Sequence, residues 1–97
     1  MKFLITWQLH DDKIHDTLAL FSQMTEDQEA ALMGDDMRLI GRWHDLVRGS
    51  GAAIYESDSA EAISKYSLAW NKHMDLDISV VVDDAEAKAI GKKAAGN

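Results

Sequence analysis

The chain has 97 residues, of which 46% are hydrophobic and 28% charged, which is typical of one soluble globular domain over residues 1–97. Its 17 acidic and 10 basic residues give a formal net charge of -7, which repels phosphate backbones and anionic lipid heads. We therefore expect neither nucleic acid nor a membrane as a partner. The sequence has no cysteine, which excludes disulfides and thiolate chemistry and fits a cytoplasmic protein.

The first expected elements are a strand over residues 2–10 and a helix after it. Apolar residues alternate along the strand, which indicates one buried face: Phe3, Ile5, Trp7 and Leu9. Asp11 or Asp12 can cap the helix. Apolar residues then recur at helical spacing: Ile14, Leu18, Phe21 and Met24.

A short extra helix and a central hairpin follow. Thr25 and Gln28 have the spacing of a capping box, which predicts a helix through Met33 that Gly34 ends. Strand-like runs at residues 37–44 and 52–56 flank a Gly-Ser-Gly segment, which predicts a β-hairpin.

The last third of the chain predicts a helix, a strand and a terminal helix. Asp58 and Glu61 have capping-box spacing. An apolar stripe follows them: Ile63, Tyr66, Trp70 and Met74. Residues 76–82 alternate as a strand, and the acidic pair at 83–84 begins a helix that we expect to end near Lys93.

This order of elements is that of a ferredoxin-like βαββαβ fold, with a four-stranded antiparallel sheet, an extra short helix and a C-terminal helix. Right-handed crossovers place the first strand between the fourth and the third, with the second at the edge. One strand parity should face the helices: Phe3, Ile5, Trp7, Leu39, Trp43, Leu76, Ile78 and Val80. The other face then carries a mixed set: Leu4, Thr6, Gln8, His10, Ile40, Arg42, His44, Asp77, Ser79 and Val81.

A sheet face of this mixed kind commonly packs against a second copy, which predicts a homodimer of the dimeric α+β barrel type. Four stretches also resemble a known family: MKFLITW at 1–7, LIGRWH at 39–44, DSAEA at 58–62 and VDDAEA at 82–87. The chain resembles an uncharacterised bacterial family of small ferredoxin-like proteins, the domain of unknown function 3303 family. Its members usually have a Pro/Gly-rich loop where this chain has residues 25–35. The resemblance implies a fold related to the dimeric α+β barrels, and no established activity.

All four histidines are expected at one end of the sheet: His10, His15, His44 and His73. Imidazoles gathered there could bind a metal or act as an acid-base pair, although histidines are also common in exposed chain reversals. No pair has the His-x-x-x-His spacing of a helical zinc site, so we expect neither a metal nor a cofactor.

The tryptophans Trp7, Trp43 and Trp70 all fall on the parity assigned to the space between sheet and helices. Simple packing accounts for most buried aromatic residues. The functional alternative is a ligand cavity lined by Trp7, Trp43 and Tyr66. Under either reading Trp43→Ala should be strongly destabilising, whereas His44→Ala should not.

Arg42 and His44 share the open-face parity, and Tyr55 joins them if the hairpin register permits. An arginine on a sheet face needs a partner, and Asp77 of a second copy could supply it. The candidate binding residues are Trp7, His10, Arg42, Trp43, His44, Tyr55 and Tyr66.

The sequence contains no assembled catalytic motif, so three functions stay open. The leading hypothesis is a small dimeric domain that binds a small molecule or a partner protein. The alternative is a cofactor-independent monooxygenase or isomerase that acts on a small aromatic or keto-acid substrate, with a His or Tyr as proton shuttle. The third is a purely structural dimer.

Overall fold

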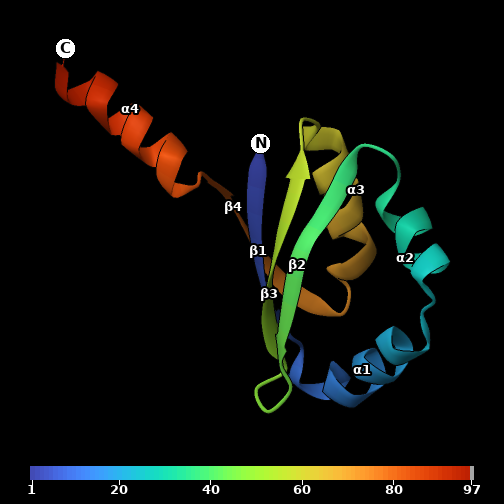
Figure 1. Ribbon diagram of the computed structural model, residues 1–97. Coiled ribbons are helices and arrows are strands. Elements are labelled where there is room, and N and C mark those ends of the chain that lie inside the picture. The colour runs from blue at the N-terminus through green and yellow to red at the C-terminus, as the bar shows by residue number, and fades with distance from the viewer. Residues whose placement is uncertain (97) are drawn as a thin grey trace.

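The structure is a computed structural model that describes residues 1–96 and has the expected order of elements (Figure 1). Its elements are β1 (Lys2–Leu9), the short 3-10 helix η1 (Asp11–Lys13), α1 (Ile14–Gln23), α2 (Glu26–Met33), β2 (Met37–Asp45), β3 (Ser50–Ser57), α3 (Ala60–Trp70), β4 (Met74–Val81) and α4 (Asp84–Gly96). Within this part of the chain no helix is both long and apolar enough to cross a membrane.

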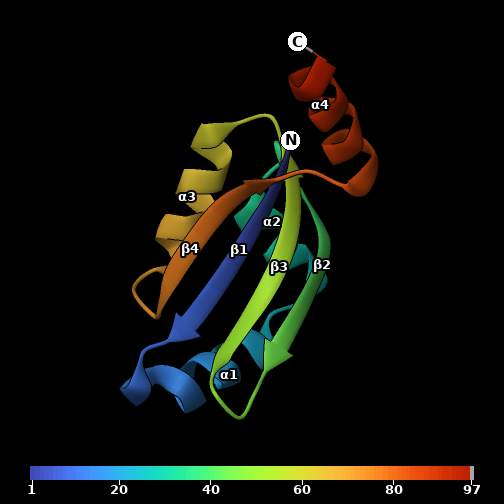
Figure 2. The same ribbon diagram turned by 90° about the vertical axis from the view of Figure 1, so that its left-hand side faces the viewer.

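The four strands form one sheet in the order β2-β3-β1-β4, and every neighbouring pair is antiparallel. This is the predicted strand order, and the ferredoxin-like fold is confirmed. Helices α1, α2 and α3 all cover one face of the sheet, and the other face is bare (Figures 1 and 2). Because β1 and β2 run parallel on either side of β3, both end at the same edge of the sheet.

The helix starts show which capping predictions hold. The capping box of α2 is present, since Thr25 Oγ1 accepts from Gln28 N at 3.1 Å and Gln28 Oε1 accepts from Thr25 N at 2.9 Å. The prediction for α3 is wrong by one residue: Ser59 Oγ accepts from Ala62 N at 3.0 Å. Asp58 instead pairs with the amino group of Met1.

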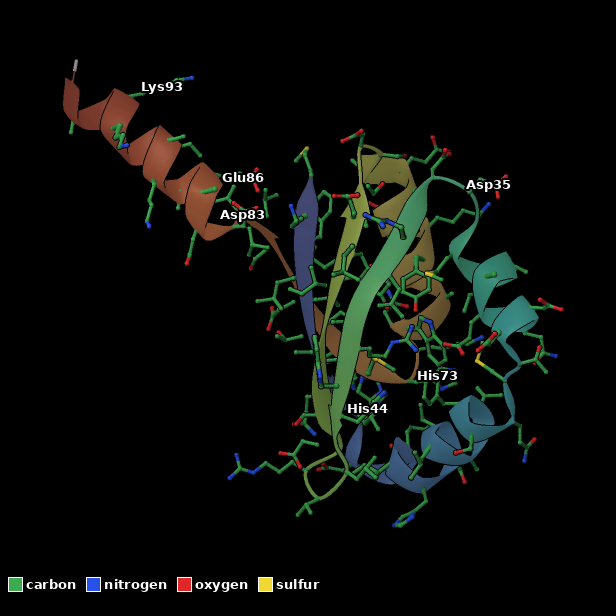
Figure 3. All side chains as sticks on the ribbon, viewed as in Figure 1. Asp35, His44, His73, Asp83, Glu86 and Lys93 are labelled. Atoms are coloured by element: carbon green, nitrogen blue, oxygen red, sulfur yellow. The ribbon has the colours of Figure 1, made fainter. Side chains whose placement is uncertain are left out.

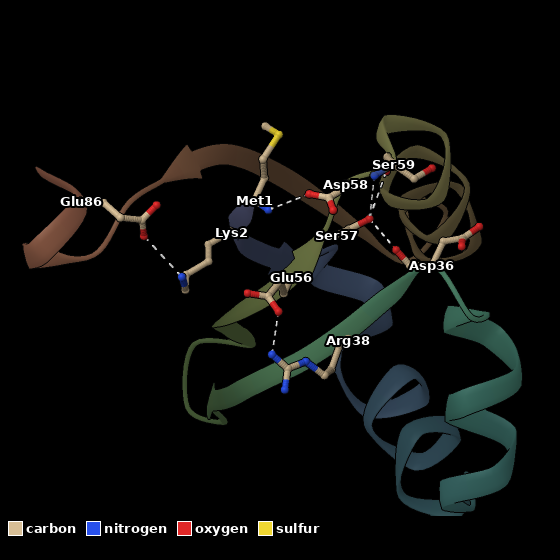
Figure 4. A network of polar contacts seen from close by, with 9 residues as sticks. All are labelled: Met1, Lys2, Asp36, Arg38, Glu56, Ser57, Asp58, Ser59 and Glu86. Carbon is tan, nitrogen blue, oxygen red and sulfur yellow. Dashed lines mark hydrogen bonds and ion pairs between the residues drawn. The ribbon is translucent and has the colours of Figure 1, made fainter. Parts of the chain in front are cut away.

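The start of the first α-helix and the end of the last one also differ from expectation. Asp11 and Asp12 lie in the 3-10 helix and do not cap α1, whose N-cap is Lys13. Helix α4 runs beyond Lys93 to Gly96, and none of its described residues is buried. It projects away from the sheet, tied to it near its start by an exposed Lys2–Glu86 pair of 3.4 Å (Figure 4). Exposed pairs of this kind contribute at most about 1 kcal/mol.

The polar network of Figure 4 closes the end of the sheet where β1 begins. Ser57 Oγ, at the end of β3, donates to the Asp36 carbonyl at 2.6 Å and accepts from Ser59 N at 3.0 Å. The amino group of Met1 reaches Asp58 at 3.1 Å. These contacts fix the starts of β2 and α3 to the end of β3, so polar side chains hold the elements together at this end of the sheet.

The central hairpin turns earlier than the Gly-Ser-Gly segment suggested. The loop covers residues 46–49, and Ser50 and Gly51 already belong to β3. Gly49 has a φ of 67°, in the left-handed region that favours glycine, and Asp45 Oδ1 accepts from Arg48 N at 3.1 Å.

A β-bulge in β2 is the largest departure from the sequence prediction. Leu39 is opposite Tyr55 and Gly41 is opposite Ile54, so Ile40 is an extra residue in the ladder. One extra residue reverses the facing of everything after it, because side chains alternate along a strand.

The expected facing of residues 41–44 is therefore wrong. Arg42 and His44 lie on the helix-covered face, where Arg42 is opposite the fully buried Ala53. Trp43 lies on the bare face with 63% of its surface exposed, and its indole covers Gly41. Trp43→Ala is accordingly not the core deletion that the sequence suggested.

The core lies between the sheet and the helices, as expected. Its buried apolar residues are Phe3, Ile5, Met37, Ala53, Tyr55, Ile63 and Tyr66. Leu76 on β4 packs against this cluster. Ile78 and Val80 share its face, since they are opposite Ile5 and Phe3, but they are 42% and 61% exposed at the edge of the sheet.

We predict that replacing Gly51 by alanine destabilises the fold. A Cβ there would overlap the Trp7 indole and lie 2.5 Å from the Trp43 carbonyl oxygen. Gly51→Ala should lower the free energy of unfolding by about 1 to 3 kcal/mol, as overpacking does, in urea unfolding followed by circular dichroism. The matched control is Gly91→Ala in α4, where a Cβ meets nothing within 4 Å and alanine favours the helix. Equal urea midpoints for the two variants would contradict the packing argument.

Candidate functional site

A cavity of about 90 Å³ lies between the helix-covered face of the sheet and helices α1 and α3. It is at the end of the sheet where β1 and β2 end. Most of its wall is apolar, with Ile5, Trp7 and Leu76 from the sheet, Ile14, Leu18 and Phe21 from α1, and Trp70 from α3. Few polar groups reach it, and they come from four different elements.

The first polar group is Arg42, whose guanidinium is mostly buried. Its Nη1 donates to Glu29 Oε1 of α2 at 2.8 Å, and the side chains of Arg42 and Glu29 are 12% and 27% exposed. The guanidinium also lies 5.2 Å from the centre of the Phe21 ring. The expected pairing of Arg42 with Asp77 of a second copy is wrong, because the bulge turns Arg42 to the other face.

A chain of hydrogen bonds extends from Arg42 into the core. Arg42 Nη2 donates to the Tyr55 hydroxyl at 3.4 Å, and the hydroxyls of Tyr55 and Tyr66 are 3.0 Å apart. The two rings are tilted against each other with centroids 5.3 Å apart. The chain therefore connects α2, β2, β3 and α3 across the cavity wall.

Burial determines the protonation of this chain. Burial opposes the Arg42 cation, but the hydrogen bond to Glu29 and the nearby Tyr55 outweigh it, so the pKa of Arg42 is raised and the cation persists. Burial raises the pKa of Tyr66, and its neighbour Tyr55 adds to the effect. Tyr66 is therefore neutral at physiological pH and keeps its hydroxyl proton.

His44 stands at the mouth of the cavity. Its ring meets Trp7 edge-on with centroids 5.4 Å apart, and Phe21 lies 5.1 Å away. Burial and then the positive charge of Arg42 lower the pKa of His44, while Glu29 opposes them. Near neutral pH the imidazole is thus uncharged, with one nitrogen able to accept a proton.

Two of the other lining side chains have buried polar atoms without a partner, and sequence reasoning did not select them as site residues. Thr17, on α1, is only 4% exposed, and its Oγ1 has no hydrogen-bond partner among residues 1–96. Trp70 Nε1, on α3, is also buried without a partner. It lies near the Tyr66 hydroxyl, where it favours the ionised phenol, but at a geometry too poor for a hydrogen bond. The signal for Thr17 was its position between Ile14 and Phe21, in the apolar stripe of the helix.

Five of the seven predicted site residues lie around this one cavity: Trp7, Arg42, His44, Tyr55 and Tyr66. Trp43 and His10 do not. Trp43 is on the opposite face of the sheet, whereas Trp70, which the sequence also placed between sheet and helices, does line the cavity. His10 Nε2 instead contacts Asp75 Oδ1 at 3.2 Å.

Three of the histidines lie at one end of the sheet, as expected. His10 N donates to the His73 carbonyl at 3.0 Å, and His44 and His73 lie toward the same end of the sheet (Figure 3). Within residues 1–96, no group of three or more His, Asp or Glu side chains could hold a metal ion.

The lowered pKa of His44 predicts a pH dependence of stability. The unfolded chain binds more protons than the folded one once the pH falls below the ordinary histidine value of about 6.5. The contribution of neutral His44 is thus present above that pH and lost below it. In chemical unfolding at about pH 7.5 and about pH 5.5, the acid-induced loss should be smaller in His44→Gln than in the parent chain. Burial also lowers the pKa of His73, so the variant keeps part of the pH dependence of stability. An identical loss in both proteins would contradict this assignment.

Comparisons with known proteins give distant similarities to solved structures. No curated protein matches the chain. An uncharacterised NIPSNAP domain protein from Burkholderia xenovorans is similar in structure, with 13% identity and a TM-score of 0.47 over 87% of this chain and 97% of that one. A dimeric ferredoxin-like protein from an uncultured marine organism gives 14% identity and a TM-score of 0.46 over 86% and 94% of the chains. Both TM-scores are below 0.5, so neither protein bears on the ligand or the assembly of this one.

The family comparison covers almost the whole sequence. The model of the family described as "Domain of unknown function (DUF3303)" matches residues 1–95. This match confirms the resemblance carried by residues 1–7, 39–44, 58–62 and 82–87, and includes every residue that lines the cavity. The chain belongs to the DUF3303 family.

Proposed function

We propose that this protein is a small-molecule binding domain whose ligand occupies the cavity between the sheet, α1 and α3. The observation that carries the proposal is a largely apolar cavity onto which Thr17, Arg42, Tyr55 and Tyr66 converge from four elements. Sites for small molecules combine an apolar wall with a few placed polar groups in this way.

The size of the cavity supports the same conclusion. Protein interiors are close-packed, so a space of about 90 Å³ between the sheet and the helices is more than loose packing leaves in a small core. A domain of 97 residues has a thin core and little stability to spare. The volume is below the roughly 300 Å³ of pockets for drug-sized ligands, so the ligand is small.

Filling the cavity should abolish binding. The hydroxyl of Ser67, which lines the cavity, donates to the Ile63 carbonyl of its own helix, so Ser67→Leu fills space without leaving a new unpaired group. Three probes, 2-pentanone, butyrate and 2-methyl-1-pentene, are tested singly by saturation-transfer NMR. We expect at least one of them to bind the parent chain and none to bind Ser67→Leu.

The matched control is Ser64→Leu, the same change at an exposed position of α3, which should bind as the parent does. Circular dichroism verifies the fold of both variants. Binding that survives in Ser67→Leu, or no saturable binding of any of the three probes to the parent, would remove the cavity as the ligand site.

A catalytic use of the same site, as a cofactor-independent isomerase, is the second candidate, and His44 favours it. A neutral imidazole at the cavity mouth could take a proton from the carbon next to a substrate carbonyl, while a protonated Tyr66 stabilises the resulting enolate oxygen. With a β,γ-unsaturated ketone the enolate is conjugated, and returning the proton to its far carbon moves the double bond and completes an isomerisation. Hydrogen-deuterium exchange of 2-pentanone that the parent accelerates and His44→Gln does not would support this use, and equal exchange in both would exclude it.

We also propose that the protein is a homodimer whose bare sheet faces pack together. This face exposes Trp43 and carries the half-buried Leu4 and Ile54, and α4 projects on the same side with Ile90 exposed (Figure 2). A face of four strands of about eight residues measures about 19 by 27 Å. Two such faces bury about 1,000 Å², close to the lower limit of a stable interface, and α4 adds to it. A second copy fits this face because antiparallel sheets stack face to face.

A charge on the bare face should separate the protomers. Trp43→Arg is expected to reduce the mass in light scattering from twice 10.8 kDa to 10.8 kDa, because it buries unpaired cations between the two sheets. Leu68→Arg makes the same kind of change on α3, where Leu68 is 67% exposed, and should leave the dimer intact. A parent chain that scatters as a single 10.8 kDa particle at micromolar concentration would contradict the dimer.

A further inference from the structure

We infer that the cavity selects a neutral molecule carrying a carbonyl oxygen, such as a ketone or an ester, over a carboxylate or a hydrocarbon of the same shape. This inference rests on the proposed function and names the class of ligand for the same cavity. Three features of the wall carry it: an excess of hydrogen-bond donors, a positive charge that is already balanced, and an apolar surround.

The Tyr55–Tyr66 pair has one hydroxyl proton more than it uses. Two hydroxyl oxygens 3.0 Å apart share a single proton between them, so the second proton is left over. Tyr55 already accepts from Arg42 Nη2, and this contact favours Tyr55 as the donor to Tyr66 because hydrogen bonds in a chain polarise one another. The spare proton therefore belongs to Tyr66.

Two more donors add to this excess. Trp70 Nε1 can only donate, and it is buried near the Tyr66 hydroxyl without a partner among residues 1–96. Thr17 Oγ1 is the third unpaired group, from the opposite helix. Buried donors without an acceptor are costly, so a ligand that supplies only acceptor lone pairs gains more here than one that brings further donors.

Charge decides between a neutral acceptor and an anion. The Arg42 cation already has its counterion in Glu29 at 2.8 Å, within a pair that is largely shielded from solvent. A carboxylate ligand would therefore add an uncompensated negative charge to a partly buried site, or would have to displace Glu29. A carbonyl oxygen accepts the same hydrogen bonds at no such cost.

The rest of the wall decides against strongly polar ligands. Trp7, Leu18 and Leu76 surround the donors with apolar surface. The ligand is accordingly a short hydrocarbon body with one carbonyl group, held with its oxygen toward Tyr66 and Trp70.

The test uses three probes of one shape that differ in a single group: 2-pentanone, butyrate and 2-methyl-1-pentene. Each is titrated into the ¹⁵N-labelled full chain while the three tryptophan indole N–H signals are followed, with Trp70 assigned through Trp70→Phe. The ketone should bind at least several-fold more tightly than either other probe and should shift the Trp70 signal downfield. The Trp43 signal, on the opposite face of the sheet, serves as an internal control and should not move.

A second variant tests whether Thr17 contributes a hydrogen bond to the carbonyl oxygen of the ligand. Thr17→Val keeps the shape of the side chain and removes an unpaired hydroxyl, so the fold should be at least as stable as before. Affinity for 2-pentanone should fall by about two- to ten-fold, and affinity for 2-methyl-1-pentene should not fall. A gain or no change for the ketone would remove Thr17 from its recognition.

The outcomes separate this inference from the proposed function. If no probe binds, the cavity is not a ligand site and both fail. If butyrate or the alkene binds at least as tightly as the ketone, and Ser67→Leu abolishes that binding, the cavity is a ligand site but the preference for a neutral carbonyl is wrong. Binding of the ketone with an unmoved Trp70 signal would also overturn the inference.

Discussion

The bulge at Ile40 is the constraint on which the site depends. One unpaired residue in β2 turns Arg42 and His44 toward the helices and sends Trp43 to the bare face. Without it the cavity would have an indole in place of a cation and an imidazole. The same shift places His44 opposite Gly51. Gly51 is also opposite Trp7 of β1, and the absence of a side chain there gives the Trp7 indole its room.

Turning an arginine inward imposes further requirements on the fold. A guanidinium that is 12% exposed needs a counterion, and Glu29 supplies it from α2, a helix with no buried residue among those described. This short polar helix is thus held over the sheet partly by an ion pair. The hydrogen bond to Tyr55 and the Tyr55–Tyr66 contact carry the same polar chain across the core to α3.

The two faces of the sheet have different roles in the proposals made here. The covered face combines a packed core at one end with a cavity at the other, where the unpaired Thr17 and Trp70 atoms lie. The bare face carries both polar and apolar side chains, exposes Trp43 and continues toward α4. Because Trp43 and Arg42 are neighbours in β2, this one strand contributes a side chain to each face.

The sequence by itself determined the elements, their order and the strand order of the sheet, because alternation, helical stripes and capping residues such as Thr25 act over a few neighbours. It also placed Trp7 and Tyr66 beside one cavity, whereas it grouped Tyr55 with Arg42 and His44 on the other face of the sheet. Only the tertiary structure decided which way residues 41–44 face, since a bulge depends on how β2 fits β3 and leaves no local pattern. It likewise decided that Glu29 is the partner of Arg42, because this contact joins elements whose approach is set by packing and not by sequence spacing.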